Sequence, residues 1–287
     1  MKNYYLVFFA FLYSPLLIFA EPEIAPAKTS QVSVAEGYEQ FKAGHLDEAL
    51  AIFDKVLEKD SDNIEARFGQ AVIFAEKKRH KDAFDAYNWI TQQNPQHSGA
   101  WNGRGLAAFN LEDFDEALAS FQRSVADQPV NGFYYESIAW AQMCRGKFQE
   151  AAESAKLALL MYNRKGITSL YPLLIAFFSY HESGDSENAL RTLQYASKDK
   201  LTDHWPTPVI RYLNGKIDEA KLISFVSSLA EETEAHTYIG LYMRLLGETE
   251  TANRHLNWVS QHGDSEVFEY TLAKTLNLKE NALSLLR

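Results

Sequence analysis

The sequence predicts an all-α protein, a right-handed α-solenoid of stacked helix-turn-helix repeats that ends in a capping helix. Three observations predict it. Four alanines recur with a spacing of 34 residues, the segments around them align without a gap, and aromatic and helix-ending residues recur at fixed offsets from them. A fixed period of this length is typical of stacked supersecondary units rather than of one globular core.

The first twenty residues have the pattern of a secretory signal peptide. Lys2 precedes an apolar run of sixteen residues, Tyr4 to Phe19, and the small Ala20 stands before a polar stretch. A retained anchor is the alternative, but a proline interrupts the run, which is shorter than the ~20 residues of a membrane-spanning helix. We therefore expect cleavage after Ala20, an exported periplasmic or secreted protein with no stable membrane anchor, and a flexible lead-in over residues 21–32.

Residues 33–163 are expected to form four regular units, which carry the alanines Ala49, Ala83, Ala117 and Ala151. A small residue here lets the two helices of a unit approach closely. Four residues later the first three units carry a ring, which can fill the gap to the next unit: Phe53, Tyr87 and Phe121. The second and third units end in Pro95 and Pro129, which disfavour helical geometry in the preceding residue.

The third unit carries the most complete set of these positions. Counted from Ser98, Trp101 stands at position 4, Gly105 at 8, Ala117 at 20, Phe121 at 24 and Pro129 at 32. These positions resemble the tetratricopeptide repeat, a pair of antiparallel helices. The resemblance implies that the first helix of each unit lines a concave surface that binds other proteins.

The remaining chain continues the pattern less regularly. A fifth unit is expected over 164–200, shifted by four residues because Ala189 lies 38 residues after Ala151. Degenerate and final units are expected over 201–263, where the two prolines of Trp205-Pro206-Thr207-Pro208 argue against a regular first helix. Residues 264–287 are expected to form the helix that caps the open end of the stack.

A second, looser resemblance covers about a third of the chain. The segments from Trp205 to Lys216, from His236 to Tyr242 and from Gly263 to Leu276 resemble the end of NlpI-type envelope lipoproteins. Those proteins dimerise and act as adaptors that present peptidoglycan hydrolases to a processing protease. The resemblance implies an envelope protease or a peptidoglycan hydrolase as partner, although the lipidated cysteine of that family is missing from this sequence.

Composition and motifs argue against several function classes. The net charge is −10 and no basic patch is present, so we expect no nucleic-acid partner. The eight histidines form no His-Glu-x-x-His pattern and no Gly-x-Ser-x-Gly motif occurs. We expect no enzyme, no metal and no cofactor. The single cysteine, Cys144, is either a buried small apolar residue or a free thiol that can form an intermolecular bridge.

The predicted partner-binding groove follows from the resemblance. Its lining is apolar and aromatic with a few amides, which suits an extended peptide or a helix. The alternative is that some of these rings pack under neighbouring repeats or under the C-terminal tail. The predicted groove residues are Tyr38, Phe41, Phe68, Val72, Asn102, Leu106, Phe109, Asn110, Phe133, Glu136, Trp140, Met143 and Phe178.

Two functions are therefore open. The first is an exported, non-enzymatic scaffold or adaptor that binds a peptide or protein in the concave groove, with a role in maintaining the cell envelope. The second is a structural, self-assembling homodimer whose groove is filled by its own chain or by a second copy. The sequence alone does not separate them.

Overall fold

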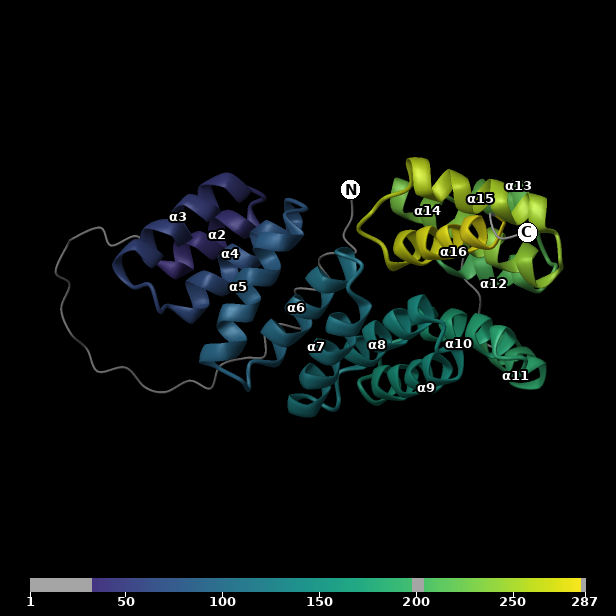
Figure 1. Ribbon diagram of the computed structural model, residues 1–287, viewed down its shortest axis with the longest axis horizontal. Helices are drawn as coiled ribbons and strands as arrows, with labels where there is room; N and C mark the ends of the chain where they lie inside the picture. The colour runs from purple at the N-terminus through teal and green to yellow at the C-terminus, as the bar shows by residue number, and fades with distance from the viewer. Residues whose placement is uncertain (1–32, 198–203, 285–287) are drawn as a thin grey trace. The chain divides into compact units, whose positions relative to one another are not determined.

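The computed structural model describes residues 33–197 and 204–284, with side chains through residue 277. The expected signal peptide and lead-in lie outside the described residues. Within them the chain forms fifteen helices, α2 to α16, and no strand (Figure 1). They divide into two compact units, unit 1 up to Pro95 and unit 2 from Gln96. The all-α solenoid of stacked helical hairpins is confirmed.

Unit 1 contains two helical hairpins. Its helices are α2 (Val34–Lys42), α3 (Leu46–Lys59), α4 (Ile64–Glu76) and α5 (His80–Gln93). Phe53 of α3 is fully buried. A Cβ added to Gly37 would lie 2.5 Å from Cε1 of this ring, and a Cβ on Gly69 of the next repeat would clash with the ring as well. The ring therefore joins the two repeats, as its position in the sequence predicts.

Unit 2 begins with three further hairpins and ends in five C-terminal helices. The hairpin helices are α6 (Ser98–Asn110), α7 (Phe114–Asp127), α8 (Gly132–Arg145), α9 (Phe148–Arg164), α10 (Tyr171–Glu182) and α11 (Ser186–Ala196). The C-terminal helices are α12 (Thr207–Leu213), α13 (Glu219–Ile223), α14 (Leu229–Leu245), α15 (Thr249–His262) and α16 (Phe268–Ser284).

The prolines end their helices where the sequence predicts. α5 ends at Gln93 and α7 at Asp127, each two residues before the proline. In the fourth repeat Asn163 takes the place of the proline, and α9 continues to Arg164 before Gly166 turns the chain at φ +69°. Asn163 has a backbone N–H, which proline lacks, so α9 can continue past this position. The four-residue shift of the fifth repeat therefore lies in the connection between α9 and α10.

The segment Trp205-Pro206-Thr207-Pro208 corrects an expectation. Its two prolines argue against a regular helix, yet α12 begins at Thr207 and contains Pro208 in its first turn. That expectation was wrong because the first turn of a helix needs no intrahelical N–H donor, so a proline is tolerated there. α12 is short, with seven residues.

The last helix has a wider role than a cap. α16 packs against α14 and α15 and also contacts α8, which belongs to the fourth repeat (Figure 1). Helix α8 supplies concave-face residues in the predicted groove. The C-terminal helix thus reaches the surface that the sequence analysis assigns to a partner.

Candidate functional site: the concave face of unit 2

The first residue of α16, Phe268, is held by three rings of the repeats. Its ring stacks on Trp140, with centroids 5.8 Å apart and an interplanar angle of 3°. It meets Phe109 edge to face at 5.0 Å and lies 6.5 Å from Phe133. We call these three rings of α6 and α8 the aromatic socket. Stacked and edge-to-face pairs at these distances are favourable arrangements, so Phe268 fills a matched site.

Most of the predicted groove residues on unit 2 are covered in this structure. Phe109 and Trp140 are each 1% exposed. Phe178 is also buried and stacks on Tyr238 of α14 at 5.8 Å. The residues of this group that are buried are Asn102, Phe109, Glu136, Trp140, Met143 and Phe178, and those that are half-buried are Leu106, Asn110 and Phe133. The rings of unit 2 thus pack under the C-terminal helices, and partner binding by them stays a prediction.

The predicted groove residues on unit 1 take part in repeat packing. Tyr38 meets Phe53 edge to face at 5.1 Å, and Phe68 meets Tyr87 at 5.6 Å. Tyr38, Phe41 and Phe68 are half-buried, whereas Val72 is buried. Unit 1 therefore retains partly exposed aromatic side chains at the predicted positions.

Three buried carboxyl groups belong to Glu136 of α8, Glu234 of α14 and Glu269 of α16. The charge of Glu269 acts on both of the others, and we call the three groups the carboxyl cluster. The Tyr238 hydroxyl donates a hydrogen bond of 2.5 Å to Oε1 of Glu269. Glu234 Oε2 accepts one of 2.6 Å from the Trp205 indole and a second from a tyrosine. Neutral donors thus hold Glu234 and Glu269.

Burial dominates the ionisation of the carboxyl cluster. Burial raises the pKa of Glu136 against an opposing hydrogen bond with Tyr162, and with a smaller contribution from the Glu269 carboxylate this pKa reaches about 8. Burial raises the pKa of Glu269 to about 7, against the opposing hydrogen bond from Tyr238. Burial and the charge of Glu269 raise the pKa of Glu234 well above its ordinary value. Protons therefore neutralise much of this cluster near neutral pH.

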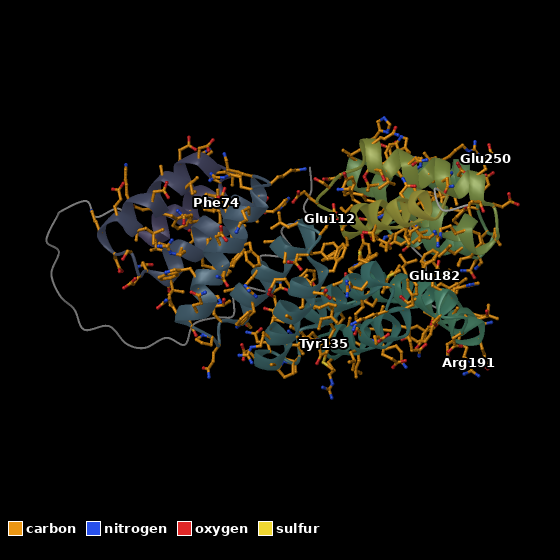
Figure 2. The ribbon with its side chains drawn as sticks, in the orientation of Figure 1. Phe74, Glu112, Tyr135, Glu182, Arg191 and Glu250 are labelled. Carbon is orange, nitrogen blue, oxygen red and sulfur yellow. The ribbon has the colours of Figure 1, made fainter. Side chains whose placement is uncertain are left out.

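Two charged pairs join the C-terminal helices to the repeats. Lys274 of α16 pairs with Glu112, and Arg244 Nε of α14 lies 3.8 Å from Glu182 Oε1 (both glutamates are labelled in Figure 2). Lys274 and Glu112 are well exposed, and exposed pairs of this kind contribute roughly 0–1 kcal/mol. The aromatic socket and the carboxyl cluster are the main contacts of the site.

The sequence analysis missed Phe268, Glu234 and Glu269. These residues recur at no period, and a glutamate on a helix is usually exposed, so no local signal marks them as buried. The remaining signal was the looser C-terminal resemblance, whose segments include Phe268 and Glu269.

A histidine pair forms a second titratable group. The Nδ1 atoms of His236 and His255 lie 2.8 Å apart, and His255 Nε2 lies 3.5 Å from Glu219 Oε1. Burial lowers the pKa of His236 to about 4, and His255 contributes to that shift. Over the described ranges, no group of three or more His, Cys, Asp or Glu residues is arranged to hold a metal ion.

Cys144 is buried, with 2% of its surface exposed, which matches the first of its two interpretations. Glycine at repeat position 8 is confirmed as a packing position, since a Cβ on Gly105 would lie 2.5 Å from the Phe121 ring. In the part of the chain that the structure describes, no helix is long and apolar enough to cross a membrane.

The sequence comparisons identify the repeats. The family model described as tetratricopeptide repeat matches residues 34–98, 85–132 and 102–166. The ER membrane protein complex subunit 2-A of Xenopus laevis is 28% identical over 132 residues, which are 44% of this chain and 44% of that protein. Superkiller protein 3 of Saccharomyces cerevisiae is 32% identical over 90 residues, which are 31% of this chain and 6% of that protein. The chain thus spans less than half the length of these curated relatives.

Solved structures share the fold. MamA is 18% identical with a TM-score of 0.52, over 55% of this chain and 90% of that one. YrrB, described as a TPR protein with an unusual peptide-binding site, is 20% identical with a TM-score of 0.50, over 56% of this chain and 81% of that one. At these identities the likeness concerns the fold alone. The chain thus carries tetratricopeptide repeats, matched in sequence over residues 34–166 and in fold by these structures.

Proposed function

We propose that this protein is an exported, non-enzymatic interaction scaffold whose concave repeat surface binds a helix or peptide of a protein partner. Stacked helical repeats build extended concave surfaces that serve for binding. The observation that carries the proposal is the seat of Phe268 in the aromatic socket, because the repeats there bind an aromatic side chain of a helix outside the repeat array.

The chemistry of that contact suggests the partner class. A helix that presents one aromatic side chain would make the contacts that Phe268 makes with Trp140 and Phe109. Buried aromatic anchors of this kind often dominate the binding energy of an interface. An envelope protease or a peptidoglycan hydrolase remains a proposal that rests on the C-terminal resemblance alone.

Affinity purification after mild crosslinking, read by mass spectrometry, tests the proposal. The tagged protein is purified from its native host as wild type, Phe268→Ala and the double variant Phe268→Ala/Trp140→Ala. We expect Phe268→Ala to raise the recovery of a specific partner, because the socket is then empty, and the double variant to lose it. Leu157→Ala, at an exposed side chain of α9, is the matched control and should recover the partner as the wild type does.

Equal recovery from all four proteins would contradict groove binding. Recovery of the bait alone, as a crosslinked dimer, would instead favour the structural homodimer, the second candidate. That candidate is supported by the filling of the unit 2 groove by the chain's own helix. Circular dichroism of each variant checks that the substitutions leave the fold intact.

The proposed export has its own measurement. N-terminal sequencing of the protein purified from the host should give a chain that begins at Glu21, since the expected cleavage follows Ala20. A protein whose N-terminal sequence still begins at Met1 and which sediments with membranes would contradict cleavage and favour the retained anchor.

A further inference from the structure

The carboxyl cluster lies where the C-terminal helix enters the concave face. Its three members come from the repeats, from α14 and from α16. Glu269 directly follows Phe268, so the side chain that fills the aromatic socket and the carboxyl that joins the cluster are neighbours in the chain. The electrostatic state of the cluster and the occupancy of the socket are therefore coupled.

We propose that the carboxyl cluster is a proton-operated latch, which holds α16 in the concave face of unit 2 when protonated and releases it when ionised. Release exposes the aromatic socket to a partner. The partner's access rests on the proposed function, whereas the movement of α16 is measured on the protein alone.

The negative charge of the carboxyl cluster is neutralised by protonation rather than by a neighbouring cation. Among the described residues, the groups that act on its three carboxyls are either acidic or neutral donors, and no lysine or arginine pairs with them. They are Glu231 and Tyr238 of α14, Tyr162 of α9, Tyr171 of α10 and Trp205. On α15, His255 is directed to His236 and Glu219, and on α16 Lys274 pairs with Glu112.

Ionisation of the cluster is unfavourable while α16 is in place. Buried negative charges without a cation are costly, and the charge of Glu269 repels both Glu136 and Glu234. Glu136 Oε2 has no hydrogen-bond partner in the described structure, so the hydrogen bond with Tyr162 would compensate the charge of this carboxylate only in part. Movement of α16 into water relieves both penalties because it separates Glu269 from Glu136 and hydrates them.

The sign of the pH dependence follows from the pKa shifts. Closing raises the pKa of Glu269 to about 7 and that of Glu136 to about 8, so the closed state binds more protons than the open one. The latch is therefore at full strength below the ordinary carboxyl pKa and is lost as pH rises through about 7 to 8. Between the ordinary carboxyl pKa and these raised values, each carboxyl shifts the opening equilibrium about tenfold per pH unit, and the effect levels off above them.

Hydrogen exchange of the full-length protein tests the latch. Amide protection of residues 266–277 is measured at about pH 6 and about pH 8 and corrected for intrinsic exchange rates. We expect it to fall at least about tenfold at the higher pH. Protection of α3 should change much less, because α3 belongs to unit 1 and the latch lies in unit 2.

Neutral variants separate the latch from general effects of pH. Glutamine mimics a protonated glutamate, so the variant Glu136→Gln/Glu269→Gln should keep at pH 8 the protection that the wild type has at pH 6. Glu112→Gln is the matched control, because it removes the carboxylate paired with Lys274 on the same helix and should retain the wild-type response.

Two results would overturn the proposal. One is a wild-type protection of α16 that is equal at both pH values, and the other is a full wild-type response in the double variant. Should the double variant not fold, the single Glu234→Gln variant must weaken the response, and an unchanged response overturns the latch. A negative hydrogen-exchange result would reject the latch but not the proposed binding of a partner. Loss of partner binding with an intact pH response of α16 would instead reject the proposed function.

Discussion

Phe121 packs directly against the backbone of Gly105, and this contact sets the distance between the two helices of the third repeat. A Cβ on Gly105 would lie 2.5 Å from both Cδ1 and Cε1 of the ring. The ring itself is fully buried, as is Ala117 at the other small position of the repeat. Single residues at positions 8, 20 and 24 thus decide how closely the hairpin closes.

At this scale we predict that Gly105→Ala destabilises the protein. The added methyl group forces the buried ring to move, which costs about 1–3 kcal/mol and exceeds the ~1 kcal/mol that alanine gains in helix propensity. Urea denaturation followed by circular dichroism measures the change. The double variant Gly105→Ala/Phe121→Leu should recover part of the loss, and a more stable single variant would contradict the packing argument.

Each hairpin of the first four repeats turns through one residue in the left-handed region. The positions are 34 residues apart, with φ angles of +82° at Gly44, +58° at Lys78, +62° at Glu112 and +74° at Gly146. Glycine adopts this conformation without a steric penalty, whereas other residues pay roughly 1–2 kcal/mol for it. The left-handed turn is thus a feature of the hairpin as a whole. In repeats 2 and 3 it is formed by Lys78 and Glu112, which do not favour this conformation.

We therefore predict opposite effects of glycine at two equivalent turns. Lys78→Gly should stabilise the protein by about 0.5–1 kcal/mol, because it removes the strain of the left-handed turn. Gly146→Ala should destabilise it by about 1 kcal/mol. Urea denaturation of the two variants beside the wild type checks the pair, and a shift of both in the same direction would contradict the assignment.

The protonation of buried groups acts on the whole of unit 2. The carboxyl cluster has raised pKa values, whereas the pKa of His236 is lowered to about 4. The two effects have opposite signs. The carboxyls make folding less favourable as pH rises toward 8, and the neutral histidine makes it less favourable as pH falls below its ordinary value of 6.5.

We predict that the free energy of unfolding falls between about pH 6.5 and 8. Each carboxyl contributes up to about 1.4 kcal/mol per pH unit while it is protonated in the folded state and ionised in the unfolded state. Urea denaturation at a series of pH values measures this slope. Glu136→Gln should reduce it, and a stability that rises over the same interval would contradict the raised pKa values.

The repeat half of the fold could be predicted because its signals are local and periodic. Ala49, Ala83, Ala117 and Ala151 are all fully buried, and the helices before Pro95 and Pro129 end as expected. In a solenoid each repeat contacts mainly its neighbours, so a pattern with a period of 34 residues specifies both the hairpin and its stacking. The sequence by itself thus determined the fold class and the tetratricopeptide repeats of residues 34–166.

Which residues fill the concave face of unit 2 was decided by the tertiary structure. Phe268 meets Phe109 across more than half of the chain, and Glu136, Glu234 and Glu269 converge from three helices. Such contacts are made once, by single residues at unrelated positions, and leave no period in the sequence. A glutamate has the same local pattern whether it is solvated or buried, so only the packing of α16 on α8 determines its charge.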